Sequence, residues 1–336
     1  EMYGGYLINW GEYDKGMTLL SGALRISEEN RVGETYIHAL EDIAHFYLQT
    51  DEGEKLRAAG EKLLSLSREL GKENHAGLAL RFLGMAKQIE GDFDGAEEIF
   101  TRSVKVFENL ALTGRSYTLS MLAPKCYIGE MRQRRGGAAE ALKLFEECVT
   151  TCEKRGLFWG RSHFHAHAAD AAFDIGDRAL FEAHVRKGAE LFESSKGGHC
   201  TSLLYSLKAI CDADAGDAEG ALDSLRKADF LSAIGKKSWH AAQYMAKAWT
   251  AAAVEEGRLD GAPFADALGR PAARYAEEAA RAYREIGAEG RAEFIEQKFI
   301  QGVDDAACAK AGAPRNFCKN ARKARRPVNF LCNIRS

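Results

Sequence analysis

The sequence has 336 residues and a formal charge of −3, from 46 Lys and Arg against 49 Asp and Glu. Hydrophobic residues make up 46% of it, and no apolar run approaches the roughly 18 residues of a membrane helix, which excludes a disordered chain and a membrane-spanning one. Eight Cys in a chain of this length do not make a disulfide scaffold, so we expect a cytoplasmic protein with reduced thiols.

A turn pattern recurs along the chain. It consists of Gly, then an acidic, polar or small residue, and a small residue about five positions later, and it begins at Gly11, Gly91, Gly136, Gly176, Gly216 and Gly257. The intervals are 80, 45, 40, 40 and 41 residues, and a degenerate member (TDEGEK, around Asp51) lies halfway along the longest. The pattern predicts seven units with a period of about 40 residues.

Each unit is predicted to hold two amphipathic helices. After Gly91, apolar or small residues recur at three- and four-residue spacing from Phe93 to Phe107, and a second periodic run precedes it from Leu78 to Ile89. The turn glycine lies where the first helix must stop, and the small residue after it lets the two helices approach closely. Because no strand alternation of useful length occurs, we expect an all-α solenoid over residues 1–302.

These units resemble tetratricopeptide (TPR) repeats. The segment Leu83–Val104 carries the Leu-Gly pair, a Gly seven residues after it, and then an aromatic, a small and an aromatic residue at Phe93, Ala96 and Phe100. Tyr3–Leu24 matches nearly as well. The resemblance covers residues 2–300 and implies a right-handed superhelix of about seven helix-turn-helix repeats. The second unit departs from it because it lacks a clean turn, and the last because it carries an insert with Pro263 and Pro271.

The period of about 40, in place of the usual 34 or so, is similar to the repeat arrays of bacterial MalT-type signalling and transcription regulators. In those proteins the arrays adjoin ATPase and DNA-binding domains. Aligning the turn at Gly11 places Glu1 inside a helix that should begin earlier. We therefore expect a fragment with a truncated first helix, from a parent chain that carries an effector domain upstream.

Four polar residues are predicted to share one helix face, which the alignment places on the concave side of the superhelix. His163 and His167 are i,i+4 neighbours, and Asp170 and Asp174 continue their face. Two imidazoles and a carboxylate can ligate zinc, but a further ligand from a neighbouring helix is needed and the sequence does not identify one. The alternative is a polar groove in which His and Asp side chains hydrogen-bond each other, and we expect no bound metal or cofactor.

The same alignment predicts the rest of a groove for a protein or peptide ligand. A lining of aromatic, Met and charged groups suits an extended or helical peptide, with apolar anchors for affinity and charges for register. Packing between successive helices is the alternative role for several of these side chains. The predicted lining comprises the four residues above together with Arg81, Phe82, Met85, Gln88, Cys126, Tyr127, Glu130, Arg134, Leu203, Ser206, Leu207, Ile210, Tyr244 and Lys247.

No motif of an enzyme is present. The sequence contains no GxSxG, no P-loop and no GxGxxG after a strand, and its glycine-rich turns join two helices, so they are not phosphate cradles. Cys148 and Cys152 are i,i+4 neighbours, and Cys148 falls on a buried small-residue position. We expect a non-enzymatic protein-binding module of a bacterial regulator or scaffold.

A basic tail is predicted at residues 303–336. Residues 310–336 carry eight Lys and Arg and no Asp or Glu, which leaves −11 for the rest of the chain. A nucleic-acid-associated regulator that binds phosphates through this tail is the alternative function, and metal-dependent activity at His163 and His167 is a third. Three further interpretations of the tail remain: a disordered segment, a non-native sequence, or a segment that folds back onto the acidic solenoid. The candidate phosphate contacts are Lys319, Arg322, Lys323, Arg325 and Arg326.

Overall fold

The computed structural model describes residues 2–9, 12–30, 32–113, 117–157, 160–195, 202–232 and 237–301. These residues form α-helices and no β-strand. The helices are α1 (Met2–Asn9), α2 (Tyr13–Glu29), α3 (Gly33–Gln49), α4 (Gly53–Glu69), α5 (Glu73–Ile89), α6 (Phe93–Leu112), α7 (Thr118–Arg134), α8 (Ala138–Lys154), α9 (Arg161–Ile175), α10 (Arg178–Ser195), α11 (Ser202–Asp214), α12 (Ala218–Ser232), α13 (Lys237–Glu255), α14 (Ala272–Glu285) and α15 (Glu289–Glu296).

The first fourteen helices form the seven predicted pairs, α1–α2 through α13–α14. The turn glycines at 91, 136, 176, 216 and 257 all have positive φ, between 71° and 86°. This left-handed conformation ends the first helix of each pair, and glycine adopts it without a Cβ clash. Asp51 takes the same conformation (φ 59°) in the second unit, where the sequence pattern is degenerate. The predicted period and all-α repeat architecture are therefore confirmed.

Small residues bring the two helices of a pair together. A Cβ atom at Gly84 of α5 would lie 2.5 Å from the Phe100 ring of α6, and one at Gly129 of α7 would lie 2.5 Å from the Phe145 ring of α8. The small residue after the turn is buried as predicted at Ala96, Ala141 and Ala221, whereas Ala262 in the last unit is exposed. The Leu-Gly pair of the TPR resemblance thus has a packing role, because its glycine makes room for an aromatic ring of the next helix.

The hydrophobic core follows the stack of helices from end to end. One cluster joins α2 and α3, a second extends from α3 to α7, a third from α7 to α9, and the largest from α9 to α15. The first helices of successive units also contact each other, as α7 does with α9 and α9 with α11. Each unit therefore buries its apolar face against its neighbours, as in other repeat proteins.

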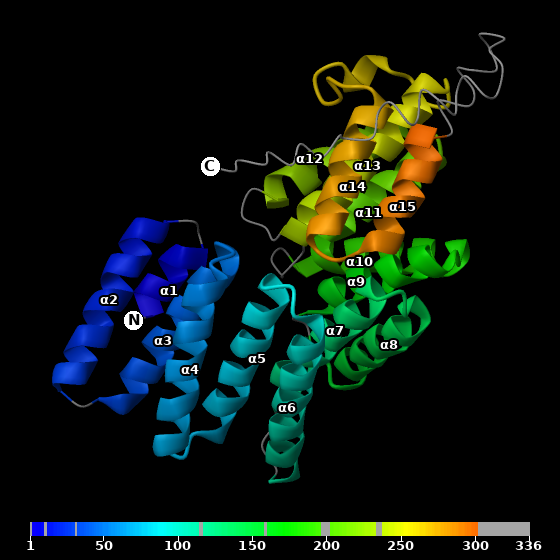
Figure 1. Ribbon diagram of the computed structural model, residues 1–336. Helices are drawn as coiled ribbons and strands as arrows, with labels where there is room; N and C mark the ends of the chain where they lie inside the picture. Colours follow the sequence, from blue (N-terminus) through cyan, green and yellow to red (C-terminus); the bar gives the residue numbers. More distant parts are fainter. Residues whose placement is uncertain are drawn as a thin grey trace, which may run out of the picture.

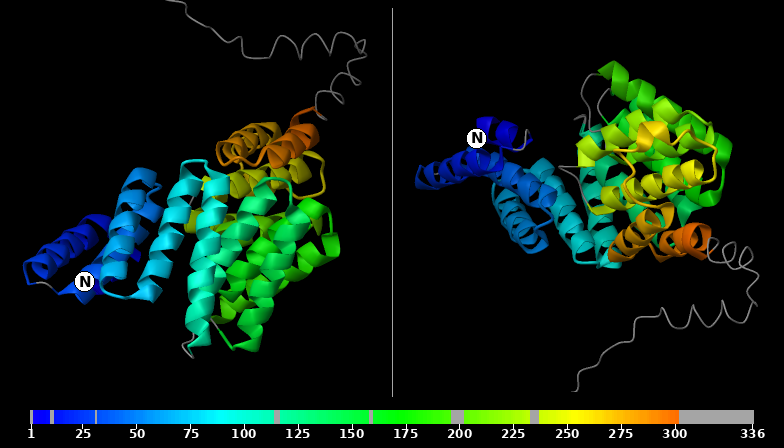
Figure 2. Two further views of the ribbon diagram at one scale, coloured as in Figure 1. Left: turned by 60° about the horizontal axis from the view of Figure 1, so that its bottom comes forward. Right: turned by 90° about the horizontal axis from the view of Figure 1, so that it is seen from above.

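The stack curls at its C-terminal end. Figures 1 and 2 show α1 to α4 at one end of the molecule, and α14 and α15 turned back toward α7 and α9. Hydrogen bonds join these parts of the chain: Arg134 of α7 donates to the carbonyl of Ile286, and Arg291 of α15 donates to carboxylates of α9. The concave side is thereby closed by the last helices.

The end of the array has two additions to the repeat pattern. The predicted insert lies between α13 and α14; it contains a short 3₁₀ helix (Ala262–Phe264), and Pro271 precedes the first residue of α14. After the seventh pair come α15 and a π-helical turn (Gln297–Gln301). The predicted tail at 303–336, with Lys319 to Arg326, lies outside the described residues. Among the described helices, none has the length and hydrophobicity that a bilayer crossing requires.

Candidate ligand-binding site

A cavity of about 850 Å³ lies where the C-terminal helices curl back over the middle of the stack. Its walls come from α7, α8, α9, α10, α11, α13, α14 and α15, so side chains more than 100 residues apart in the sequence share it. This volume falls within the range of pockets that hold a small ligand. Its apolar wall includes Phe173, Phe181, Leu203, Trp249, Ile286 and Phe294.

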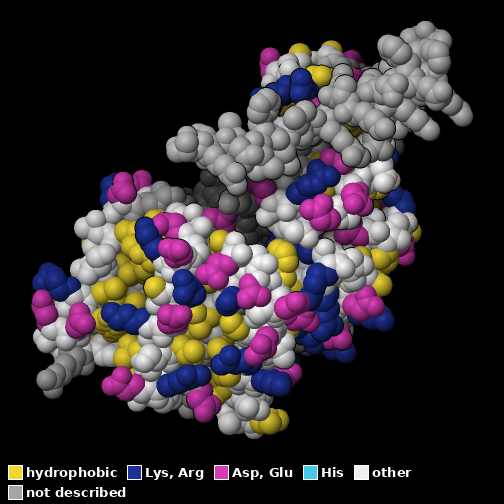
Figure 3. All heavy atoms as spheres, viewed as in Figure 1, with side chains coloured by type: hydrophobic (Ala, Val, Ile, Leu, Met, Phe, Trp, Pro, Cys, Tyr) yellow, Lys and Arg dark blue, Asp and Glu magenta, His cyan; other side chains and the backbone are white. Residues whose placement is uncertain are grey.

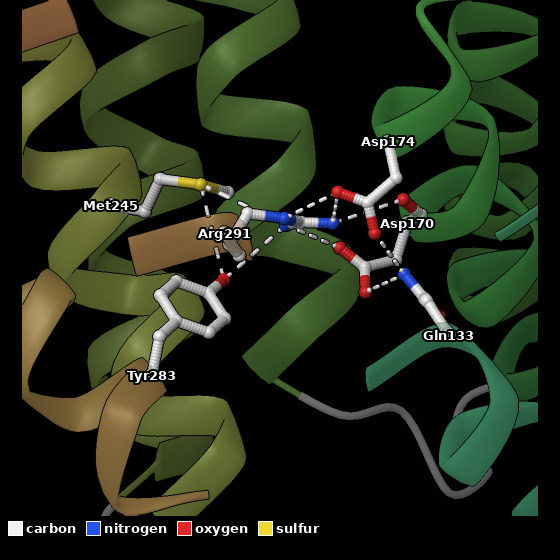
Figure 4. A network of polar contacts seen from close by, with 6 residues as sticks. All are labelled: Gln133, Asp170, Asp174, Met245, Tyr283 and Arg291. Carbon is white, nitrogen blue, oxygen red and sulfur yellow. Dashed lines mark hydrogen bonds and ion pairs between the residues drawn. The ribbon is translucent and has the colours of Figure 1, made fainter. Parts of the chain in front are cut away.

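A buried arginine closes one side of the cavity. Arg291 of α15 donates from Nε to Asp174 Oδ1 at 2.6 Å and from Nη1 to Asp170 Oδ1 at 2.9 Å, and its side chain is only 5% exposed. From the opposite side, the Gln133 amide of α7 donates to both carboxylates, at 2.8 and 2.7 Å. Figure 4 shows the two aspartates held between these donors. One arginine and one amide thus tie α7, α9 and α15 together.

The groups around Arg291 favour the charged form of its guanidinium. Burial lowers the pKa of Arg291, but the carboxylates of Asp170 and Asp174 outweigh that effect and hold its pKa well above the ordinary value. Nη1 also lies 3.4 Å from the Tyr283 hydroxyl and 3.8 Å from the Met245 sulfur. Burial raises the pKa of Tyr283, so its hydroxyl is neutral at physiological pH.

A second cluster of polar side chains, on α7 and α9, lies beside the cluster around Arg291. Glu130 is 9% exposed; its carboxylate lies 3.6 Å from Arg134 Nη2 and 3.5 Å from His167 Nε2. Arg134 also lies over the Phe93 ring, 5.7 Å from the centroid, and donates to the Ile286 carbonyl at 3.5 Å. The cavity wall is therefore built from buried charges that are already paired.

More accessible side chains surround the mouth of the cavity. Phe294 of α15 is 40% exposed and stacks edge-to-face on Phe173, with the ring centroids 6.0 Å apart. Arg178 of α10 is half-exposed and pairs with Glu182 and Asp214. Figure 3 shows Lys and Arg side chains gathered around α7, whose last turn carries two arginines. A ligand at the mouth would thus meet an aromatic surface beside positive charge.

The structure brings together six of the predicted groove residues in this cavity. The lining includes Glu130, Arg134, His167, Asp170 and Asp174. These five residues lie on α7 and α9. The two helices are the first helices of the fourth and fifth units, and they face the curled C-terminal end. Of the other residues that the alignment nominated, Leu203 also lines the cavity.

The remaining predicted residues lie elsewhere. Phe82, Met85 and Leu207 are buried in the core, which is the packing role left open by the sequence. Outside the cavity, Arg81 lies over the Phe82 ring and Tyr127 packs on Phe100. Tyr244 packs against the largest core cluster, Lys247 pairs with Asp229, and the His163 ring packs on that of His167 at 4.5 Å.

The residues that sequence reasoning missed are those contributed by helices far along the chain. Arg291 lies 121 residues after Asp170, Tyr283 comes from the seventh repeat, and Gln133 lies one residue from a predicted position. Among these residues, only Trp249 stands out in the local sequence, because it is a large aromatic residue in an alanine-rich helix. Its indole N–H donates to Asp214 at 2.6 Å. The pairing depends on how far the superhelix curls, which no local pattern reports.

Three described thiols are unsuited to nucleophilic catalysis. Burial raises the pKa of Cys148 to about 12, of Cys152 to about 11 and of Cys211 to about 12. A thiol is reactive as the thiolate, so these side chains are inert at neutral pH and pack as small hydrophobes.

No protein-family model and no curated protein matches the sequence. Solved structures do match. A Rap protein in complex with competence and sporulation factor aligns with a TM-score of 0.60 at 13% identity, over 89% of this chain and 74% of that one. The fold is TPR-like. A signal transduction ATPase with a tetratricopeptide repeat sensor from Pyrococcus horikoshii gives 0.45 at 14% identity, over 84% and 47%, and a TPR protein from Parabacteroides merdae 0.37 at 17%, over 68% and 91%.

Proposed function

We propose that this TPR-like chain is a binding module that holds a short peptide in the cavity between α7, α9 and α15. The observation that carries the proposal is the cavity itself: about 850 Å³, on the concave side, lined by eight helices, with an aromatic wall and paired charges. Concave surfaces of stacked repeats are the usual binding surfaces of such proteins. The Rap protein of similar fold, solved with competence and sporulation factor, is a precedent for ligand binding by this fold.

The lining sets the chemistry of the ligand. Phe173, Trp249 and Phe294 offer an aromatic wall for one bulky apolar side chain, and aromatic contacts of this kind supply most of the affinity at such interfaces. Asp170 and Asp174 already pair with Arg291, so charged groups of the ligand would meet the half-exposed Arg178 and the exposed Glu289 at the mouth. The ligand is a peptide with an apolar anchor between charged groups.

The site also provides a route for signalling to a larger protein. A ligand in the cavity touches α15 on one side and α7 and α9 on the other, and Arg134, Arg291 and the Phe173–Phe294 ring pair also join these parts of the chain. Binding therefore changes how tightly the array curls. In a bacterial regulator or scaffold, this change would pass to an effector domain in the same parent chain.

The proposal is tested with a library of synthetic peptides of five to eight residues, screened against the purified chain and ranked by calorimetry. Phe294→Ala removes the exposed aromatic ring of the cavity, and we expect it to lower the affinity for the selected peptide by about tenfold or more. Phe230→Ala is the matched control, because Phe230 of α12 is 81% exposed and does not line the cavity. Both variants should retain the wild-type melting temperature within about 2 °C.

Two results would overturn the proposal. One is a library in which no peptide binds below about 100 μM, because a built cavity of this size should reach that affinity with a suitable ligand. The other is a selected peptide whose affinity falls equally in Phe294→Ala and Phe230→Ala, which would place the binding surface outside the cavity.

A further inference from the structure

Two neighbouring helices each present a pair of metal-ligating residues at i,i+4 spacing. Helix α7 carries Cys126 and Glu130, helix α9 carries His163 and His167, and the two helices are in contact. One donor atom from each of Cys126, His163 and His167 lies within 4.8 Å of the other two. The sequence indicated the two histidines with a carboxylate of the same helix face, whereas the third residue of this group is a thiol from the preceding repeat.

The cluster is enclosed by the protein. Cys126 is 0% exposed, His167 is 5% exposed and His163 is half-buried. The Phe145 ring lies 5.3 Å from the His167 ring, and Phe164 packs beside His163. A thiol and two imidazoles are thus gathered where water has little access, which is the setting of metal sites that stabilise a fold.

We propose that Cys126, His163 and His167 form a zinc site. Thiolate and imidazole are the ligands that zinc prefers, and a tetrahedral ion with Zn–S of about 2.3 Å and Zn–N of about 2.0–2.1 Å separates its donor atoms by about 3.3–3.6 Å. The observed donors, all within 4.8 Å of one another, therefore need to close by at most about 1.5 Å, which side-chain rotation supplies. The Glu130 carboxylate lies 3.5 Å from His167 Nε2 and offers an oxygen donor beside this group.

The ion would cross-link consecutive repeats. Because its ligands come from α7 and α9, binding is linked to folding of the middle of the array and raises its stability. His167 and Glu130 also line the cavity, so the zinc site supports one of its walls. The zinc site does not depend on the identity of the cavity's ligand.

A second group of possible ligands provides a control. His38, Glu41 and His75, on α3 and α5, also lie with donor atoms within 4.8 Å, but they include no thiol and His38 is exposed. His75 Nδ1 lies 2.5 Å from the Glu41 carboxylate, which is an ordinary histidine–carboxylate pair. Cobalt bound there gives no thiolate charge-transfer band, so the two groups are distinguishable by spectroscopy.

The test uses the chain purified without a histidine tag and stripped of metal with a chelator. Cobalt(II) is added first and then displaced by zinc. We expect one equivalent of metal, the intense visible bands of tetrahedral cobalt and a thiolate-to-cobalt charge-transfer band. Cys126→Ser should remove that band. His167→Asn should lower the affinity for zinc by at least about 100-fold, because loss of residues that only orient metal ligands already lowers metal affinity by about 10–100-fold. Cys211→Ser and His75→Asn should change neither.

X-ray absorption of the zinc-loaded wild-type protein needs no substitution and so stands even where a variant does not fold. It should show one sulfur at about 2.3 Å and nitrogen or oxygen neighbours at about 2.0–2.1 Å. The proposal is overturned by a zinc shell without sulfur, by a charge-transfer band that survives in Cys126→Ser, or by the absence of metal binding at tenfold molar excess.

Discussion

At the scale of single residues, Arg291 holds the closed side of the cavity. Its guanidinium is almost fully buried, and it pairs with two aspartates whose side chains are 17% and 23% exposed. A buried charge is costly by itself, and the cost is offset only when its partners are well placed. The two carboxylates and the Gln133 amide supply that arrangement, so removing the arginine leaves two partly buried negative charges side by side.

Arg291→Ala is therefore expected to lower the free energy of unfolding by about 3–5 kcal/mol, as measured by urea denaturation. Arg284→Ala is the matched control. Arg284 lies at the end of α14, where its exposed side chain pairs with Glu296 and Glu289, and loss of surface pairs of this kind costs under about 1 kcal/mol. Equal destabilisation by the two variants would contradict the role given to Arg291.

The sequence predicted the residues that α9 contributes to the Arg291 network and to the proposed zinc site. The spacing of His163, His167, Asp170 and Asp174 placed them on one face of a helix, and three of the four line the cavity. The alignment placed Cys126 of the preceding repeat in the same groove without identifying it as a ligand, and Arg291, on a helix past the seventh pair, was not predicted. Helical periodicity reports which residues share a face, whereas the contact between faces depends on the curvature of the whole array.

At the scale of helices, the backbone conformation at the turns distinguishes the glycines. Gly91 has a φ of +82°, whereas Gly22 lies inside α2, and a Cβ atom added at either position would meet nothing within 4 Å. Side-chain crowding is therefore absent at both, and only the backbone differs. In the left-handed conformation an L-residue costs about 1–2 kcal/mol, and in a helix interior alanine is favoured over glycine by about 0.5–1 kcal/mol.

Gly91→Ala is accordingly expected to lower the free energy of unfolding by about 1 kcal/mol, and Gly22→Ala to raise it by about 0.5–1 kcal/mol. Thermal and urea unfolding of the two variants beside the wild type measure both effects. Shifts of the same sign would show that the turn conformation is not what selects glycine at the repeat boundaries.

The helix pairs were predictable because each one repeats a local pattern, with a turn, a small residue and an apolar stripe at fixed spacing. Even the degenerate second unit was located from its interval, and Asp51 takes the conformation that glycine has elsewhere. Helix α15 was not separated from the last unit, because its turn glycine, Gly287, follows Gly257 by 30 residues and so falls outside the period of about 40. Its importance lies in long-range contacts that no repeat pattern includes.

At the scale of the whole molecule, the curl of the array depends on a close contact at the α14–α15 turn. Gly287 has a φ of +74°, and a Cβ atom added there would clash with the Phe93 ring at the start of α6. Gly257 has a similar φ of +71° with nothing within 4 Å of an added Cβ. The two glycines share the backbone strain that a substitution would introduce, and only Gly287 has the long-range contact.

Gly287→Val is therefore expected to lower the free energy of unfolding by about 1–3 kcal/mol more than Gly257→Val, and to increase the radius of gyration measured by small-angle scattering while helicity is kept. The difference between the variants isolates the contact with Phe93. Identical scattering profiles and equal stability would mean that the C-terminal helices are held back by other contacts alone.

A peptide ligand in the cavity formed where α15 curls over α7 and α9 would contact the helices that line it. Hydrogen–deuterium exchange of the chain with and without a library-selected peptide therefore locates the binding site. Binding should slow exchange in α9 and in the α14–α15 segment, which line the cavity, and leave α2 and α4, which contribute nothing to it, unchanged. Protection confined to α2 and α4, with α9 and α15 exchanging as in the peptide-free chain, would contradict binding in the cavity.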